Sequence, residues 1–416
     1  MSERPYSRRR CALASEPAPA LRIHPPVFLS EPGLAAILTA LPDARIVGGA
    51  VRDTLLCRPV TDIDIATPQS PDRVIEALDG AGIRALPTGL SHGTVTALGP
   101  TRGFEITTLR QDIETDGRHA QVVFTESWQA DASRRDFTLN ALSLTRLGAV
   151  FDYYGGLGDL IAGRLRFVGR PEQRIAEDRL RALRYFRFFA FFARLPPDTP
   201  TLAALTLAAT ELGNLSAERV WSEIKRLLAA PDPRAALALM RSTGVLAALL
   251  PEARDPSAVD QLLTVGAPSE PLLRLAALVA GARSAKDLPN LLASRFRFSA
   301  AETETLSRLL SGPVPPPSAD AAALRRLLAE EPAEFLIART LLAGIRGPEG
   351  GRLRARLATA PRPVFPLAGR DALALGMAPG PAVGAALAAV RTWWLAGGCV
   401  ADAATCRAEL LSRLRA

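Results

Sequence analysis

Two aspartates separated by one residue are the clearest chemical signal in the sequence. Asp62 and Asp64 lie in Thr61–Thr67, which alternates polar and apolar residues as a strand does. In a strand both carboxylates lie on one face at roughly 7 Å spacing, and they repel each other unless a cation lies between them. Oxygen ligands without nearby histidine or cysteine favour Mg²⁺, and two such ions about 3.5–4 Å apart support nucleotidyl transfer. The alternative is a solvated strand face.

A glycine pair precedes these aspartates. Gly48 and Gly49 follow the apolar run Ile46–Val47 and lead into a predicted helix that holds Arg52 and Asp53. Glycines let backbone N–H groups approach an anion closely, and an arginine can hold a phosphate through two parallel hydrogen bonds. Taken alone, such a pair is more often an ordinary turn.

A third carboxylate is expected at a two-metal site. The stretch Gly103–Arg110 predicts a strand in which Phe104 and Ile106 face the core, so that Glu105 lies on the opposite face. Glu105 is therefore the candidate third carboxylate, and the alternative is a surface glutamate on a half-buried strand. We interpret His92, just before the neighbouring strand, as a turn residue and not as a base.

These motifs, in this order, resemble the head of the class II tRNA nucleotidyltransferases and bacterial poly(A) polymerases, which belong to the polymerase β superfamily. The resemblance covers about residues 46–228 and is strongest to the CCA-adding members. It continues in five further segments: Arg110-Gln111-Asp112 through Asp116–Ala120, Ser133–Ala141, Asp152–Leu160, Glu177–Arg184 and Leu215–Trp221. Each motif is modest alone, and six in order are very specific.

The resemblance implies roles for residues beyond the aspartates. Arg110 and Asp112 introduce the segment that is similar to the flexible loop of CCA-adding enzymes. Arg135, Asp136 and Asn140 belong to the segment that is similar to the ribose-contacting motif. Without that role, Arg135 and Asp136 would form a local ion pair.

The segment Glu177–Arg184 resembles the family's nucleotide-selecting helix. Asp178, Arg181 and Arg184 are three residues apart and are expected near one helix face. A carboxylate accepts from the exocyclic amine of cytosine or adenine, and an arginine donates to a ring acceptor. The resemblance gives this role to Asp178 and Arg181, while Arg184 and Arg187 would meet phosphates or orient the pair. A basic amphipathic helix packed into a neck is a compatible reading.

Beyond about residue 170 the strand-like patterns stop and Ala/Leu/Arg helical patterns continue, interrupted by proline-rich joints. We therefore predict an α+β protein, with a small mixed-sheet head of the polymerase β type followed by helices. The predicted segments are a disordered tail over 1–25, a catalytic head over 26–169, a helical neck over 170–230, a helical body over 231–311 and a tRNA-binding helical tail over 318–416.

The charge of the chain suits a polyanionic partner. Its 416 residues carry a net charge of +8, and nearly all of the 50 basic residues are arginine. A genome biased toward arginine codons contributes to this excess. Because only 6% of residues are aromatic, the helical part suits a folded RNA recognised through shape and phosphates, such as the acceptor end of tRNA.

The remaining composition narrows the class of protein. Four scattered cysteines and three histidines give neither a disulfide framework nor a zinc pattern, which favours a cytoplasmic location. The histidine shortage also excludes an appended histidine–aspartate phosphohydrolase domain. We find no apolar run long enough for a membrane span and no secretory signal. No obligate protein partner is evident.

The predicted function is template-independent addition of CCA, from CTP and ATP, to the 3′ end of tRNA. Mg²⁺ held by Asp62 and Asp64 would assist the transfer, and pyrophosphate would leave. Poly(A) polymerase and A-adding activity remain alternatives, although the segments around His92 and Asp116–Ala120 resemble the CCA-adding side. A non-catalytic RNA-binding protein and a small-molecule nucleotidyltransferase are the lesser alternatives.

Overall fold

The protein was analysed as a computed structural model that describes residues 16–115, 120–253, 256–281 and 287–415. The chain forms two compact units. Unit 1 holds the residues up to Leu215 together with Ser242–Ala248, and unit 2 holds Ser216–Arg241 and Leu249–Ala416. The predicted division into head, neck, body and tail stays a prediction.

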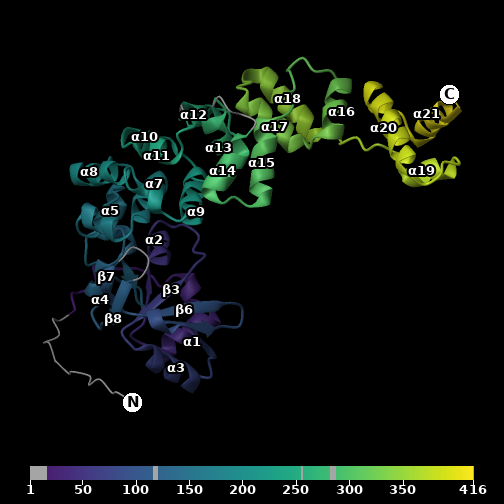
Figure 1. Ribbon diagram of the computed structural model, residues 1–416. Coiled ribbons are helices and arrows are strands. Elements are labelled where there is room, and N and C mark those ends of the chain that lie inside the picture. Colours follow the sequence, from purple (N-terminus) through teal and green to yellow (C-terminus); the bar gives the residue numbers. More distant parts are fainter. Residues whose placement is uncertain (1–15, 116–119, 254–255, 282–286, 416) are drawn as a thin grey trace. The chain divides into compact units, whose positions relative to one another are not determined.

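The core of unit 1 is an eight-stranded mixed sheet (Figure 1). Strands β3 and β6 run parallel, and the other neighbouring pairs in this sheet are antiparallel, which confirms the predicted mixed-sheet head. In spatial order the strands are β1 (Leu21–Arg22), β10 (Ala149–Phe151), β9 (Ser143–Leu144), β2 (Arg45–Val47), β3 (Asp64–Thr67), β6 (Gly103–Thr108), β5 (Thr94–Leu98) and β4 (Ala85–Gly89).

One face of this sheet packs on helices α1 (Pro32–Ala40) and α3 (Pro71–Gly80). Their leucines and isoleucines meet the inward side chains of the strands in one continuous core. Phe104 and Ile106 of β6 belong to that core, while Glu105 between them is exposed. The alternation predicted for this strand is therefore confirmed.

The strand predicted over 61–67 begins only at Asp64. The reason lies in its partner: β2 pairs with β3 from Arg45 opposite Ala66 to Val47 opposite Asp64. Directly after Val47 the chain turns away into α2 (Gly49–Leu55), so residues before Asp64 find no ladder partner there. Asp62 therefore lies just before the strand and not within it.

The predicted N-terminal tail extends too far, because residues before position 25 already join the sheet. Leu21 and Arg22 pair with the edge strand β10. Further upstream, Glu16 accepts hydrogen bonds from the Arg45 guanidinium at 2.6 Å and from the Tyr153 hydroxyl at 2.5 Å. One short β-ladder and one ion pair therefore hold the residues between Glu16 and Arg22 against the sheet. The Pro- and Ala-rich composition of this segment does not predict either interaction.

A separate hairpin follows β6. Strand β7 (Arg110–Thr115) pairs antiparallel with β8 (Ala120–Phe124), and the segment Asp116–His119 of the predicted loop lies outside the described residues. The remaining helices of unit 1 before the switch to unit 2 are α4 (Trp128–Ser133), α5 (Gly156–Ala162), α6 (Pro171–Glu177), α7 (Leu180–Phe192) and α8 (Thr199–Ala208).

In the described residues, every strand ends by Phe151 and the later elements are helical. This confirms the predicted largely helical remainder. These helices are α9 (Ala217–Leu228), α10 (Arg234–Ser242), α11 (Val245–Leu249), α12 (Ser257–Thr264), α13 (Pro271–Val279), α14 (Leu288–Phe296), α15 (Ala300–Leu310), α16 (Ala321–Glu330), α17 (Ala333–Leu342), α18 (Gly347–Thr359), α19 (Gly369–Ala374), α20 (Pro381–Ala396) and α21 (Ala403–Arg415).

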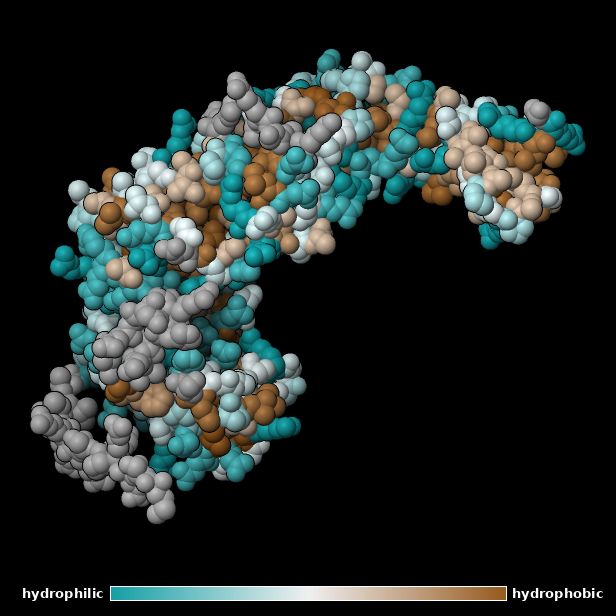
Figure 2. Space-filling model, viewed as in Figure 1, coloured by the Kyte–Doolittle hydropathy of each residue, from teal (hydrophilic) through white to brown (hydrophobic). Residues whose placement is uncertain are grey.

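The C-terminal helices α19–α21 enclose a small apolar core around Trp394. Apolar side chains also reach the surface of this region, including Val364 and Val400, and Figure 2 shows brown patches there among polar residues. Among the helices that the structure describes, none is both long and apolar enough to cross a membrane.

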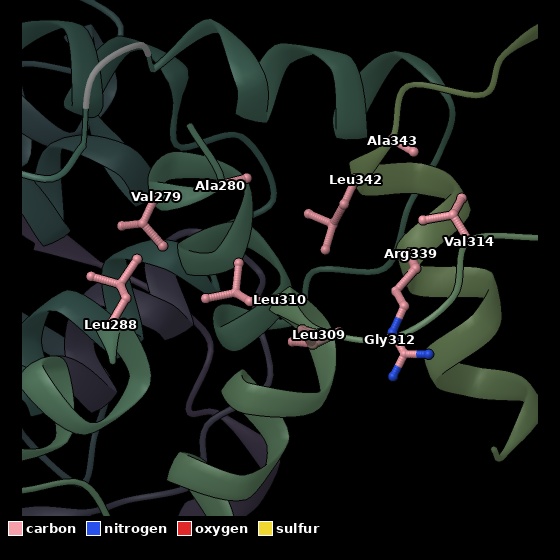
Figure 3. A pocket seen from close by; sticks show the side chains of 10 residues that line it. All are labelled: Val279, Ala280, Leu288, Leu309, Leu310, Gly312, Val314, Arg339, Leu342 and Ala343. Carbon is pink, nitrogen blue, oxygen red and sulfur yellow. The ribbon is translucent and has the colours of Figure 1, made fainter. Parts of the chain in front are cut away.

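A hollow of about 190 Å³ lies among the side chains of α13, α14, α15 and α17 in unit 2 (Figure 3). Its walls are mostly aliphatic, with Arg339 as the charged exception. The Arg339 guanidinium lies against Gly312, where an added Cβ would come within 2.8 Å of its Cζ. Only 3% of Arg339 is exposed, and Glu331 contacts it at 2.6 Å. The Arg339 guanidinium is thus buried and paired with Glu331, and we do not interpret it as a group that binds a ligand in this hollow.

We expect Glu302 to stabilise unit 2 in a pH-dependent way. Its carboxylate accepts hydrogen bonds from Lys225 at 2.7 Å, Trp221 at 3.0 Å and the backbone N–H of Ser299 at 2.9 Å. Burial alone would raise the pKa of Glu302, but these bonds outweigh it and lower the pKa to about 2. Glu302→Gln should lower the free energy of unfolding by about 1 kcal/mol at pH 6, measured by urea denaturation.

The sign of the pH dependence follows from that depressed pKa. The stabilisation by ionised Glu302 is complete above the ordinary glutamate pKa of 4.5 and is lost as the pH falls toward 2. The difference between wild type and Glu302→Gln should therefore shrink between pH 5 and about pH 3. A difference that stayed constant over this range would contradict the role of the charge.

Candidate active site

The predicted carboxylates gather at the start of β3. Asp64 is the first residue of this strand, and the parallel register places Glu105 directly beside it on β6. Paired residues of parallel strands point to the same face, so Glu105 shares the face of Asp64. Asp62, Asp64 and Glu105 are all exposed. This edge of the sheet is accessible to a ligand.

Asp64 is in an environment that disfavours its charge. Partial removal from water raises the pKa of its carboxyl above the ordinary value, the neighbouring Asp62 carboxylate raises it further, and the Arg135 guanidinium opposes both effects. Two carboxylates with this mutual repulsion are suitable oxygen donors for a hard divalent cation. Within the described residues, no group of three or more His, Cys, Asp or Glu is arranged to hold a metal ion, so Glu105 does not complete such a group.

The glycine turn lies next to this carboxylate. Gly48 has a φ of +71°, and a Cβ there would lie 3.2 Å from Nη1 of Arg135 and 3.9 Å from Oδ2 of Asp64. Arg135 in turn donates to Asp131 at 3.2 Å and to the carbonyl oxygen of Asn140 at 3.4 Å. The alternative ion pair between Arg135 and its neighbour Asp136 is therefore absent. The turn, the guanidinium and the carboxylate form one compact site.

Replacing Gly48 by alanine should lower kcat/KM for the predicted nucleotide addition at least tenfold. The positive φ strains an alanine, and the added Cβ would press on Arg135, at a combined cost of about 1–3 kcal/mol. Gly49→Ala is the matched control, because its Cβ would meet only Arg52 at an ordinary 3.5 Å. Equal losses from both variants, in single-turnover assays, would refute this explanation.

Arg52 does not point toward open solvent. Its Nε and Nη2 donate to the two carboxylate oxygens of Asp53 at 2.9 and 2.8 Å, and its Nη1 donates to Oδ1 of Asn140 at 2.7 Å. The guanidinium also lies over the Phe192 ring, 4.4 Å from its centroid. The guanidinium is thus bonded within the protein in this structure, and its predicted role in nucleotide binding stays a prediction.

Asp136 is a buried carboxylate that accepts hydrogen bonds from several neighbouring groups. Its Oδ1 accepts from the Asn140 amide at 3.0 Å and from the backbone N–H of Phe137 at 2.8 Å, and its Oδ2 accepts from both Nε and Nη2 of Arg184. Burial alone would raise the pKa of Asp136, but Arg184 and these hydrogen bonds outweigh it and lower the pKa. Asp136 therefore connects the predicted ribose-contacting segment to helix α7.

The predicted helix face of Asp178, Arg181 and Arg184 is wrong for Asp178. Helix α6 ends at Glu177, and Asp178 has extended backbone before α7 begins at Leu180. The Asp178 carboxylate accepts from the backbone N–H of Leu180 at 3.1 Å. Aspartate favours such local caps over helix interiors, which explains the break.

Arg181 is held from two sides. It donates to the Glu177 carboxylate at 2.6 Å and to the carbonyl oxygen of Arg134 at 3.2 Å. Arg174 donates to the same Glu177 oxygen at 2.7 Å. Our sequence reasoning did not select Glu177, Arg174 or Asp131, although acids three or four residues from an arginine on a helix are a recognisable signal.

The remaining candidate residues have contacts of their own. Arg187 on α7 lies over the Phe188 ring, 4.4 Å from its centroid. Arg110 donates to the carbonyl oxygen of His92, which lies in a single 3₁₀ turn, as the turn interpretation requires. Asp112 pairs with Val122 in the hairpin ladder. The structure thus joins the glycine turn, the carboxylates and α7, and gives Arg187 and Arg110 separate contacts.

Two family models match the chain. Residues 44–166 match the poly A polymerase head domain, and residues 195–255 match a probable RNA- and SrmB-binding site of polymerase A. The first range contains the glycine turn and the three carboxylates.

Curated relatives align with about half of the chain. The human "CCA tRNA nucleotidyltransferase 1, mitochondrial" is 47% identical over 189 residues, which are 45% of this chain and 44% of the relative. A Streptococcus gordonii "CCA-adding enzyme" is 39% identical over 217 residues, 52% of this chain and 53% of the relative. The chain thus spans about half the length of the curated relatives it matches.

Solved structures align over nearly the whole chain. The Bacillus stearothermophilus CCA-adding enzyme in complex with CTP superposes with a TM-score of 0.71 and 28% identity, covering 93% of this chain and 98% of that one. The Thermotoga maritima CCA-adding enzyme complexed with tRNA-CCA gives a TM-score of 0.63 at 20% identity, covering 94% and 97%. The second similarity concerns the fold.

Proposed function

Because the chain belongs to the family of CCA-adding tRNA nucleotidyltransferases and bacterial poly(A) polymerases, we propose that it adds CCA, from CTP and ATP, to the 3′ end of tRNA. The 3′ hydroxyl oxygen would form a bond to the α-phosphorus, the bridging bond to the β-phosphate would break, and pyrophosphate would leave. The observation that carries this proposal is the Asp64 carboxylate beside the glycine turn, with the Asp62 charge acting on it, in a fold similar to a CCA-adding enzyme bound to CTP.

Asp62 and Asp64 would hold Mg²⁺. Bound there, the ion supplies neutralisation of triphosphate charge and favours ionisation of the attacking hydroxyl. The exposed carboxylates and their mutual repulsion support this assignment. Arg135, beside Asp64 and the Gly48 turn, would orient the triphosphate by charge. We assign Glu105 an auxiliary place on the same face.

The base would be selected by Asp178 and Arg181. Arg181 is oriented by Glu177 and by the Arg134 carbonyl, so its guanidinium is held in one direction. The extended backbone of Asp178 puts its carboxylate at the gap between α6 and α7. One acceptor beside one donor suits the amine and the adjacent ring nitrogen of cytosine and adenine.

The test is addition to a tRNA transcript that ends at the discriminator base. Purified protein is incubated with this transcript, Mg²⁺, CTP and ATP, and the 3′ ends are sequenced. Addition of CCA followed by a stop supports the proposal. A long A tail on any RNA would instead identify a poly(A) polymerase, and addition only to tRNA ending in CC would identify an A-adding enzyme. Binding without addition would favour a non-catalytic RNA-binding protein.

A cytoplasmic location stays a prediction. It depends on the scattered cysteines, of which Cys57, Cys399 and Cys406 are free in the structure. The human relative carries the word mitochondrial in its name. Subcellular fractionation in the source cells tests the compartment independently of activity.

A further inference from the structure

Asp62 is one of the two proposed Mg²⁺ ligands, yet its backbone lies outside the sheet. Strand β3 begins two residues later at Asp64, which is held by ladders to β2 on one side and to β6 on the other. Ile63 is buried in the core, whereas Thr61 and Asp62 are exposed. The ladders therefore do not fix the chain on the N-terminal side of Asp62.

One arginine contacts the backbone directly before Asp62. Nη1 of Arg102 donates to the carbonyl oxygen of Thr61 at 2.9 Å. Within the described ranges, this is the one hydrogen bond that we observe to the backbone of residues 60–62. The Thr61 carbonyl and the Asp62 N–H belong to one planar peptide unit. The bond from Arg102 therefore restricts the plane from which Asp62 extends.

The Arg102 guanidinium is itself held by other partners. Nη2 donates to Oε2 of Glu31 at 2.6 Å, and Nε donates to Oε1 of the same carboxylate at 3.3 Å. Its Cζ also lies 4.9 Å from the centroid of the Phe104 ring, which is buried in the core. Two bonds to one carboxylate and a neighbouring ring fix the direction of a guanidinium, so Nη1 is held at Thr61.

These partners belong to closely packed parts of unit 1. Glu31 directly precedes α1, which packs into the core beneath the sheet. The turn between β5 and β6 carries Arg102 and is closed by a bond from the Gly99 N–H to the Arg102 carbonyl at 2.9 Å. A Cβ added at Gly33 of α1 would come within 2.9 Å of Pro100 in this turn. Arg102 thus connects Thr61 to two elements that are in close contact with each other.

We propose that Arg102 is a positioning residue, which holds the Thr61–Asp62 peptide and thereby keeps the Asp62 carboxylate near Asp64. This inference rests on the proposed function, because the two aspartates are the proposed metal ligands. Asp62 already acts on the charge of Asp64 in the structure. The observed bonds of Arg102 go to Glu31 and to the Thr61 carbonyl, so Arg102 acts on Asp62 through the backbone.

The affinity of the full chain for Mn²⁺ alone tests this role. Mn²⁺ takes the same oxygen ligands as Mg²⁺, and electron paramagnetic resonance measures its free concentration. Arg102→Met removes the donors and keeps an apolar stem against Phe104. The Kd of Mn²⁺ should rise about fivefold, as expected for the loss of one hydrogen bond that positions a ligand. Charge alone predicts the opposite, because removal of a nearby cation favours Mn²⁺ binding. An unchanged or lower Kd would therefore overturn the proposal.

A variant without the Asp62 charge shows whether Arg102 acts through Asp62. Asp62→Asn should raise the Kd of Mn²⁺ by itself, and adding Arg102→Met to it should raise the Kd no further. A second fivefold rise in the double variant would mean that Arg102 acts by another route, and the proposal would fall. Arg102→Lys keeps the charge and one donor group, and its Kd should lie between those of wild type and Arg102→Met.

Arg73→Met is the matched control. Arg73 also pairs with a glutamate, Glu76 at 3.1 Å, but this exposed pair lies within α3. The substitution removes the same charge from unit 1 and should leave the Kd of Mn²⁺ unchanged. A loss equal to that of Arg102→Met would show that any unpaired glutamate of this unit disturbs the measurement, and would overturn the assignment to Arg102.

The Mn²⁺ titration separates this inference from the proposed function, because it requires neither CTP nor tRNA. A wild type that binds Mn²⁺ through Asp62 but adds no nucleotide would refute the proposed function, while the comparison with Arg102→Met would still decide the role of Arg102. A wild type whose Mn²⁺ binding does not respond to Asp62→Asn would overturn the metal site and this inference with it.

Discussion

Asp64→Asn is expected to lower the rate of nucleotide addition by roughly a thousandfold or more, equivalent to about 4 kcal/mol of transition-state stabilisation. The substitution keeps the size of the side chain and removes the negative charge that would hold Mg²⁺. Asp64 adjoins the glycine turn, and the other three residues of β3 are not acids, so no other carboxylate of that strand can take its place. Single-turnover kinetics at saturating CTP measure the effect.

The fold of this variant should be intact, and its stability should rise slightly. In wild type the protein pays to keep Asp64 ionised, because burial and the Asp62 carboxylate both raise the pKa of Asp64. Removing that charge should therefore leave the unfolding midpoint equal or higher. Asp72→Asn, an exposed acid in the first turn of α3, is the matched control and should retain full activity. Near-wild-type turnover of Asp64→Asn would refute the assignment of metal ligands.

Glu331→Ala should lower the free energy of unfolding of unit 2 by about 3 kcal/mol. Glu331 accepts from Arg339 at 2.6 Å and from Nε of Arg308 at 3.0 Å. Burial alone would raise the pKa of Glu331, but the bonds from Arg339 and Arg308 outweigh it and lower the pKa. Without the carboxylate, the guanidinium of Arg339 remains buried and unpaired in charge. Urea denaturation followed by circular dichroism measures the loss.

Neighbouring Glu330 provides the control for this effect. Its side chain is 61% exposed and it contacts Arg391 at only 3.6 Å, so Glu330→Ala should cost less than about 1 kcal/mol. A double variant, Glu331→Ala with Arg339→Met, should recover part of the stability because it removes the orphaned charge as well. A double variant less stable than Glu331→Ala by the full cost of Arg339→Met would contradict the pairing.

The sequence predicted best where one local rule decides the structure. The alternation around Glu105 determined its face, and the apolar run before Gly48 determined the strand, turn and helix that follow. The sequence-based prediction was wrong where a partner distant in the sequence determines the local structure. Asp62 lies outside β3 because its partner strand β2 ends at Val47. The end of a partner strand cannot be inferred from the spacing of the aspartates.

Side-chain partners were the least predictable part of the site. Arg52 and Asn140 are 88 positions apart, and Asp136 and Arg184 are 48 apart, so spacing carries no information about these bonds. The helix break at Asp178 had a local signal in the capping preference of aspartate, but the periodic arginines suggested one continuous face. The residue types of the site were thus predictable, whereas their partners required the fold.

The strand order of unit 1 has a consequence for synthesis on the ribosome. Strand β2 ends at Val47, yet its neighbour β9 begins only at Ser143. The edge strand β1 likewise pairs with β10, which begins only at Ala149. At about 5–20 residues per second, the nascent chain carries an open β2 edge for roughly 5–20 seconds before β9 can close it. During that interval the edge can pair with other chains. Substitutions that weaken β9 should therefore reduce the yield of soluble protein more than its final stability.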